Sequence, residues 1–219
     1  MQQPITLENA SGMDIVIVDV CQGEQKGCPN LLIATSDWKR AVEEWLRAKD
    51  VPARLRARIP GGKVLHHQKL RIAIAGCPNS CSRPQIADIG LVGYVRPAVV
   101  PEECLACGLC EAACPDAAIT IDGGPPVFDA TACQGCVRCR IACPASCINL
   151  SRPGVRVFLG GKLGRHPRLA QAVAEMIEPA EVIALLDHVV NEYVECAEPE
   201  ERFSDYLFRA HTMSEVSHG

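Results

Sequence analysis

The chain has 219 residues, a net charge of −4 and an apolar fraction of 48%, which is ordinary for a globular protein. It has no basic excess that would suggest a nucleic-acid partner, and no apolar run near the roughly 20 residues of a membrane span. The unusual feature is its fourteen cysteines. The first apolar run, residues 13–20, is short and contains two aspartates, unlike a signal peptide. We therefore expect a cytoplasmic protein whose cysteines bind metal, since disulfides are disfavoured there.

The first hundred residues alternate strand and helix patterns. Residues 13–20 are rich in β-branched side chains and predict a buried strand that leads to Cys21. Residues 35–50 have apolar side chains at helical spacing, which predicts an amphipathic helix with Ser36 as its N-cap.

Residues 53–59 have the sequence ARLRARI, whose strict alternation predicts a strand that projects Arg54, Arg56 and Arg58 from one face. Residues 69–76 then predict a second buried strand, which ends at Cys77. Each buried strand is followed by a cysteine loop. This order predicts α/β packing with both cysteine loops at one edge of the sheet.

The texture changes between residues 101 and 151, where two cysteine-rich halves repeat with a shift of 29 residues. Strand and helix patterns resume afterwards: a strand over 155–161, a glycine-rich turn over 160–167, and helices over 167–177 and 180–195. We therefore predict an α+β fold. Its α/β-type domain is discontinuous, comprising residues 1–100 and 152–219, and residues 101–151 are an inserted module too small to have a core of its own.

Each half of the repeat has the spacing C-x2-C-x2-C-x3-C-P, which is that of bacterial ferredoxins with two 4Fe-4S clusters. In those proteins the fourth cysteine of each run binds the other cluster. The resemblance gives Cys104, Cys107, Cys110 and Cys143 to one cluster, and Cys133, Cys136, Cys139 and Cys114 to the second. The alternative, a pair of zinc sites, normally uses two separated pairs of ligands. Cys147 and Cys196 have no partner in this pattern and are expected to be small buried side chains.

Four cysteines remain outside the module. Cys21 and Cys28 on one loop, with Cys77 and Cys81 on the next, could hold a third 4Fe-4S cluster at a rigid sheet edge. The alternative is that they are four unrelated core cysteines.

The segment GCPNSCSRPQIADIGLVGY, residues 76–94, resembles the second cysteine motif of sirohaem-dependent sulfite and nitrite reductases. The segment VFLGGKLGRHPRLA, residues 157–170, also resembles that family, in which dissimilatory sulfite reductases carry a ferredoxin insertion between these two segments. The resemblance implies that Cys77 and Cys81 bind a cluster, that Cys81 bridges it to the sirohaem iron, and that Asn79 lies at the cofactor. Two features depart from the family: Cys21 and Cys28 enclose six residues where the family has five, and the N-terminal half of its catalytic unit is missing.

Sirohaem carries eight carboxylates, so its site should be rich in cationic side chains. The strand that is expected over 53–59 and the residues after it are basic, which predicts catalytic roles for Arg54, Arg56 and Lys69 together with Cys81. Further cofactor-binding residues are expected in the same region, after Cys81 and in the glycine-rich turn: Arg58, Arg71, Arg83, Lys162, Arg165, His166 and Arg168. The alternatives are a solvated strand face and an ordinary strand-to-helix turn.

The predicted function is that of a sirohaem-dependent sulfite or nitrite reductase, in which two ferredoxin clusters pass electrons to a 4Fe-4S and sirohaem centre. An alternative is an electron-transfer protein or subunit with three 4Fe-4S clusters and no sirohaem. Both hypotheses imply a redox partner protein, and either is compatible with a homo-oligomer or a hetero-oligomer. Only the first implies a small oxyanion substrate.

Overall fold

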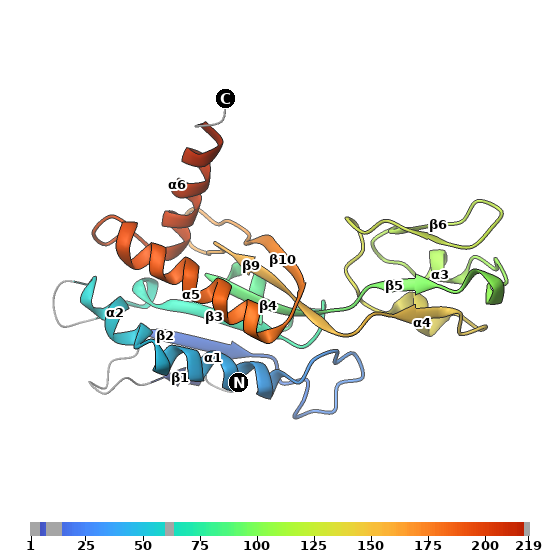
Figure 1. Ribbon diagram of the computed structural model, residues 1–219, viewed down its shortest axis with the longest axis horizontal. Coiled ribbons are helices and arrows are strands. Elements are labelled where there is room, and N and C mark those ends of the chain that lie inside the picture. Colours follow the sequence, from blue (N-terminus) through green and yellow to red (C-terminus); the bar gives the residue numbers. More distant parts are fainter. Residues whose placement is uncertain (1–4, 8–14, 60–63, 217–219) are drawn as a thin grey trace.

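The computed structural model describes residues 5–7, 15–59 and 64–216. Its main feature is a six-stranded mixed sheet in the order β1-β2-β3-β4-β9-β10 (Figure 1). Strands β2, β3 and β4 run parallel to one another. The other pairs are antiparallel: β1 with β2, β9 with β4, and β10 with β9. The strands are β1 (Ile5–Leu7), β2 (Val16–Val20), β3 (Leu70–Ala75), β4 (Ile89–Tyr94), β9 (Gly154–Leu159) and β10 (Gln171–Ile177).

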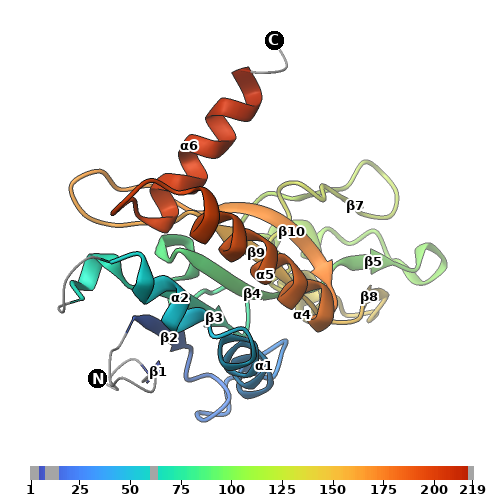
Figure 2. The ribbon, with the colours of Figure 1, turned by 60° about the vertical axis from the view of Figure 1, so that its left-hand side comes forward.

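Helices cover one face of this sheet, where Figure 2 shows α1, α2 and α5 together. Their apolar sides and the central strands form the main core, in which Val42, Leu46, Ile72 and Leu186 are fully buried. The Nε1 of Trp45 donates a hydrogen bond of 3.1 Å to Asp187. The longer helices are α1 (Thr35–Ala48), α2 (Val51–Ala57), α5 (Pro179–Cys196) and α6 (Phe203–Val216), and short 3-10 turns occupy His66–Gln68, Pro84–Ile86 and Pro101–Glu103.

Residues 97–150, here called the cysteine-rich segment, project from one end of the sheet (Figure 1). The segment leaves through β5 (Pro97–Val99) and returns through β8 (Ile148–Leu150), which pair antiparallel. Between them lie α3 (Leu109–Ala112), β6 (Ile119–Thr120), β7 (Val127–Phe128) and α4 (Arg138–Ala142). Its small apolar cluster consists largely of cysteines with Ile119 and Ile148. These elements are too short to be stable without what the cysteines bind.

The mixed helix and strand architecture confirms the α+β fold class. The strand expected at residues 69–76, the helix expected at 35–50 and the long helix expected at 180–195 are present within one or two residues. The strand expected at 13–20 is present as Val16–Val20, and residues 13 and 14 lie outside the described residues. Ser36 as N-cap is wrong, because Ala34 occupies that position.

The strand predicted over residues 53–59 is also wrong, because residues 53–57 belong to α2 and residues 58–59 follow its end. Pro52 stands in the first turn of α2, where proline's fixed backbone angle suits a helix. Val51 and Leu55 are four residues apart and both pack into the core. Alanine, leucine and arginine are all good helix formers, so this burial outweighs the alternating pattern.

The helix predicted over residues 167–177 is wrong as well. Residues 171–177 form β10, which pairs with β9 and includes two irregularities in register. Glu175 of β10 pairs with Arg156 of β9, and β10 covers backbone groups of β9 that would otherwise be unpaired. Strand pairing thus overrides the helix propensity of Ala172, Ala174 and Glu175.

Among the described residues, no helix combines the length and the apolar character that crossing a membrane requires.

Candidate functional site

The structure brings two cysteine loops together at one edge of the sheet, where β2 and β3 end. Cys21 follows β2 directly, and its amide donates a 2.9 Å hydrogen bond to the carbonyl oxygen of Ile74 in β3. The amide of Gly76 donates in return to Sγ of Cys21 at 3.2 Å. Because β2 and β3 are parallel, their carboxyl ends meet at this edge.

Cys77 and Cys81 complete this group, and we call the four thiols of Cys21, Cys28, Cys77 and Cys81 the edge quartet. Burial raises the pKa of the Cys77 thiol, and the other three thiols of the quartet raise it further. Cys81 is exposed, and the side-chain amide of Asn79 donates to its Sγ at 3.2 Å. The quartet therefore has a buried side and a side open to solvent.

Glu24 fixes the first loop of the quartet to helix α1. Its carboxylate accepts hydrogen bonds from the hydroxyl groups of Thr35 and Ser36 and from the amide of Ser36. The bonds from Ser36 lower the pKa of this carboxyl. Glu24 thus caps the helix in the place of an N-cap side chain, a role that sequence reasoning missed because the two partners lie eleven and twelve residues away.

A second group of thiols lines a cavity in the cysteine-rich segment. The cavity measures about 310 Å³, including space open to solvent, and its thiols belong to Cys104, Cys107, Cys110, Cys143 and Cys147. We call the first four the distal quartet. Cys147 is buried, as expected, and its Sγ lies 3.4 Å from that of Cys143.

A third group lines a neighbouring cavity of about 380 Å³, also partly open. Its thiols belong to Cys114, Cys133, Cys136 and Cys139, which we call the proximal quartet. Burial raises the pKa of Cys139 to about 11. Each cavity thus combines three cysteines of one half with the fourth of the other, which is the crossed arrangement that the ferredoxin spacing predicts.

Backbone amides point at these sulfurs in a repeated way. The amide of Ala106 donates to Cys104 Sγ and that of Gly135 to Cys133 Sγ, both at 3.4 Å, and these pairs are equivalent in the two halves. The amide of Ala118 donates to Cys114 Sγ at 3.3 Å. Amide donors suit thiolates that carry negative charge. Among the residues with described positions, no three His, Cys, Asp or Glu side chains could hold a single metal ion. The thiols of the distal and proximal quartets line cavities instead.

The proximal quartet is joined to the sheet by Arg156, a buried residue of β9. Its guanidinium donates to Gln134 Oε1 at 2.9 Å and to the carbonyl oxygen of Cys133 at 3.2 Å. It also pairs with Glu175 at 2.8 Å and lies 4.2 Å from the ring centre of Tyr94. Sequence reasoning did not identify Arg156, since nothing in its local pattern marks it.

Two close backbone approaches connect the proximal quartet with the edge quartet. A Cβ at Gly93, near the end of β4, would lie 2.4 Å from the carbonyl oxygen of Gly76, the neighbour of Cys77. A Cβ at Gly135 would lie 2.5 Å from the carbonyl oxygen of Val95. Residues 93–95 therefore approach the backbone beside both groups of thiols, whereas no residue of the six-stranded sheet lines the cavity of the distal quartet.

The predicted basic residues do not gather at the edge quartet. Arg54 donates to Asn191 Oδ1 at 2.8 Å, Arg56 donates to the carbonyl oxygen of Ile59, and Arg58 donates to three carbonyl oxygens at the end of α5. Helix α1 leads from the cysteine loops to α2, over about 21 Å for its fourteen residues. The arginines of α2 consequently lie toward the opposite end of the sheet (Figure 1).

The glycine-rich turn lies at that end too. Lys162 and Arg168 both pair with Asp205 of α6, so each already has a partner within the domain, whereas Arg165 and His166 are exposed. Arg71 pairs with Asp19 at 2.9 Å. Of the predicted cofactor-binding residues, only Asn79 and the exposed Arg83 belong to the cysteine loops.

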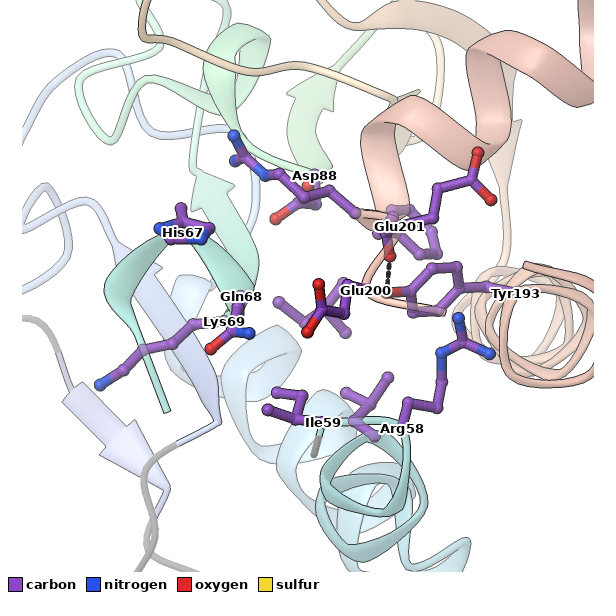
Figure 3. A pocket seen from close by; sticks show the side chains of 13 residues that line it. Arg58, Ile59, His67, Gln68, Lys69, Asp88, Tyr193, Glu200 and Glu201 are labelled. Atoms are coloured by element: carbon purple, nitrogen blue, oxygen red, sulfur yellow. Dashed lines mark hydrogen bonds between the residues drawn. The ribbon is translucent and has the colours of Figure 1, made fainter. Parts of the chain in front are cut away.

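A separate cavity of about 490 Å³, partly open to solvent, lies at the amino ends of β3 and β4, and Arg58, His67, Lys69 and Glu200 are among the side chains that line it (Figure 3). The hydroxyl of Tyr193 donates to the carbonyl oxygen of Glu201 here at 2.7 Å. Lys69, predicted to be catalytic, therefore lies at the amino end of β3, whereas the edge quartet lies at the carboxyl end of that strand. Cys196, expected to be buried, is exposed at the end of α5.

Asp88 lines the same cavity and is completely buried. Its Oδ2 accepts a 2.9 Å hydrogen bond from the amide of Arg71, and its Oδ1 contacts the hydroxyl of Ser204, which in turn lies 2.8 Å from the carbonyl oxygen of Gly161. Burial raises the pKa of Asp88. A neutral Asp88 that donates to Ser204 lets the serine hydroxyl donate to Gly161, so that all these groups are satisfied.

Two known proteins that match this chain are sulfite reductases. The coenzyme F420-dependent sulfite reductase of Methanocaldococcus jannaschii is 34% identical over 176 residues, which are 80% of this chain and 26% of that protein. The sulfite reductase (NADPH) hemoprotein beta-component of Thiocapsa roseopersicina is 25% identical over 136 residues, 62% of this chain and 14% of that protein. The chain thus spans a minor part of the length of these oxidoreductases.

The crystal structure of dissimilatory sulfite reductase I shares the fold, with a TM-score of 0.59 and 15% identity over 89% of this chain and 49% of that one. The family model described as the nitrite and sulphite reductase 4Fe-4S domain matches residues 12–212, a range that includes all three groups of thiols. The protein therefore belongs to the nitrite and sulphite reductase 4Fe-4S domain family.

Proposed function

We propose that this chain is an iron-sulfur oxidoreductase of the sulfite and nitrite reductase type that holds three 4Fe-4S clusters. The edge quartet would hold one cluster in a domain of residues 1–100 and 152–219. The proximal and distal quartets would hold two more in an inserted ferredoxin module of residues 101–151. The observation that carries the proposal is the succession of three cysteine quartets, two of which are linked by residues 93–95.

A 4Fe-4S cluster supplies one-electron transfer when it is bound. The chain's own groups favour ligation at each quartet: the amides of Gly76, Ala106 and Gly135 donate to thiolate sulfur. Each quartet also has one buried cysteine, which is Cys77, Cys110 or Cys139. The distal quartet is remote from the sheet, and the proximal quartet touches it. We infer that the distal quartet is the outer end of the series and the edge quartet its inner end.

The fit to sirohaem is different. Its eight carboxylates call for many cations, but Arg54, Arg58, Lys162 and Arg168 have partners within the domain, away from Cys81. Arg83 and Asn79 alone do not form such a site. If sirohaem binds at the exposed Cys81, further cationic side chains must come from a second copy of this chain or from another subunit. Reduction of sulfite or nitrite would belong to that assembly.

The second candidate function is an electron-transfer subunit with three clusters and no sirohaem. The observation in its favour is the internal pairing of the basic residues that were expected at the haem. The two functions differ in what lies at Cys81, and they share all three clusters.

The deciding experiment is the absorption spectrum and iron content of the protein purified without oxygen from a host that makes sirohaem. Sharp isobacteriochlorin bands over the broad iron-sulfur absorption would establish the reductase. About twelve irons without those bands would indicate the electron carrier. Substantially fewer irons would contradict the three-cluster proposal itself.

A further inference from the structure

The distal quartet lies under a surface that differs in kind from the one over the proximal quartet. Leu105 and Leu109 flank the exposed Cys107 and are 68% and 49% exposed. Large apolar side chains so exposed and so close together indicate an interaction surface more often than a solvated one.

The internal repeat provides a comparison within the same chain. With the shift of 29 residues, Leu105 corresponds to Gln134 and Leu109 corresponds to Arg138. Gln134 is hydrogen-bonded to Arg156, and Gly135 beside it is packed against Tyr94 and Val95, so the sheet covers the proximal face at these two residues, whereas Arg138 is exposed. The equivalent distal face has no such cover among the described residues, although its apolar character is greater.

Charge distinguishes the two faces further. Between Arg96 and Arg138 the chain has no lysine, arginine or histidine and six acidic residues. Three of these acids are direct neighbours of residues that line the distal cavity: Glu103 precedes Cys104, Glu111 follows Cys110, and Asp122 follows Ile121. All three are exposed, as is Glu102. Glu111 corresponds to Arg140 in the other half, so the charge at this position is reversed there.

We propose that the face formed by Leu105, Cys107 and Leu109, with its rim of Glu102, Glu103, Glu111 and Asp122, is the docking surface for a one-electron carrier protein with a basic rim around its redox centre. The inference rests on the proposed function, because it takes the distal quartet as the outer end of a series of clusters. One electron would pass from the carrier's reduced centre to the cluster at the distal quartet. Opposite charges would steer the two proteins together, and the apolar centre would exclude water from the contact.

The test uses cytochrome c, a lysine-rich one-electron protein, as a basic probe, with an acidic plant-type ferredoxin as its counterpart. The dissociation constant of each oxidised probe is measured by isothermal titration calorimetry with the whole, oxidised protein. Cytochrome c should bind more tightly than the ferredoxin, and its affinity should fall about tenfold or more between about 20 mM and 200 mM salt, because the Debye length shortens.

Two variants locate the surface. Glu102→Gln with Glu103→Gln and Asp122→Asn should weaken cytochrome c binding at low salt by about tenfold and flatten its salt dependence. The matched control removes three charges from the helical face instead, by Glu44→Gln, Glu192→Gln and Glu195→Gln, and should bind as the native chain does. Leu105→Gln with Leu109→Arg gives the distal face the residues of the proximal half and should abolish binding.

The docking inference is overturned if the control variant loses as much affinity as the acidic-rim variant, or if the ferredoxin binds more tightly than cytochrome c. Iron is measured in every preparation before binding, which separates a failure of the proposed function from a failure of the docking surface. A native protein without the module's eight irons contradicts the proposed function. A protein with full iron whose affinity ignores the acidic rim contradicts the docking surface alone.

Discussion

Gly93 of β4 lies so close to Gly76 that a Cβ on Gly93 would stand 2.4 Å from the Gly76 carbonyl oxygen. Gly76 is also the residue whose amide donates to Cys21 and whose chain neighbour is Cys77. The end of β4 is thus packed directly against the backbone that shapes the edge quartet. Glycine at position 93 is required by this close approach of two backbones.

Gly93→Ala should therefore disturb the edge quartet and leave the cysteine-rich segment intact. The methyl group meets backbone atoms, which cannot rotate away, so we expect destabilisation by roughly 1 to 3 kcal/mol and loss of about four irons. Iron analysis and urea unfolding followed by circular dichroism measure both effects. Gly124→Ala is the control, since a Cβ there meets no atom within 4 Å. Full iron in the Gly93 variant would show that the quartet does not depend on this contact.

Arg156→Met tests the link between the sheet and the proximal quartet. The variant loses the bonds to Gln134 and Cys133 and the ion pair with Glu175, which keeps its pair with Arg96, so the free energy of unfolding should fall by roughly 1 to 3 kcal/mol. Limited proteolysis should also cut more readily near residues 96 and 151. Arg152→Met is the control, because Arg152 is exposed and its ion pair with Glu178 lies at the surface. Equal effects of the two variants would contradict the role of Arg156 as the link between the sheet and the proximal quartet.

Cys147→Ala tests whether the extra thiol beside Cys143 is a ligand. Ala118 stands at the equivalent position of the other half, so alanine fits this site and all the irons should be retained. The Cys147 thiol can donate to the Cys143 sulfur 3.4 Å away, and the variant should shift the reduction potential of one cluster slightly downward. Iron analysis and a redox titration followed by electron paramagnetic resonance provide the readout. Loss of about four irons would make Cys147 a ligand instead.

Asp88 should impose a pH dependence on stability. Because burial raises its pKa in the folded state, the folded protein holds this proton more tightly than the unfolded chain does. Stability should therefore fall as pH rises from the ordinary aspartate pKa through the raised one. The nearby charges of Arg71 and Arg202 lower the pKa and limit the effect.

Asp88→Asn places a neutral amide where the structure favours a neutral acid, and can donate to Ser204 while accepting from Arg71. The variant should lose this part of the pH dependence and gain relative stability at the upper end of the window. Urea midpoints measured across that window provide the comparison, with Asp122→Asn as an exposed control. A steeper decline in the variant than in the native chain would contradict a neutral Asp88.

Sequence patterns predicted the parts of the fold that depend on local periodicity and on cysteine spacing. The β-branched runs of β2 and β3, the amphipathic pattern of α1 and the repeat of 29 residues each carry their information within a short window. Residues 53–59 and 171–177 were misassigned because their local patterns were outweighed by burial of Leu55 and by pairing with β9. Arg156 and Asp88 could not be predicted, since each joins segments that are distant in sequence, in the second case Asp88 and Ser204, 116 residues apart.

The basic residues show the same limit of prediction from sequence. Their number in the sequence suited a polyanionic ligand, but a count of charges does not reveal internal partners. Asn191 binds Arg54, Asp205 binds Lys162 and Arg168, and the carbonyl groups at the end of α5 bind Arg58.

The pairing of β4 with β9 has a consequence for how such a protein can change. Tyr94 faces Gly154 in adjacent antiparallel strands, and the amide of Ser151 donates to the carbonyl oxygen of Arg96 at 2.8 Å, so the two ends of the cysteine-rich segment meet. The whole segment occupies the place of a hairpin turn. Exchanging it for a tight turn would leave the strand order and the remaining register of the sheet unaltered. An ancestral or engineered chain can therefore gain or lose the cysteine-rich segment in a single genetic event.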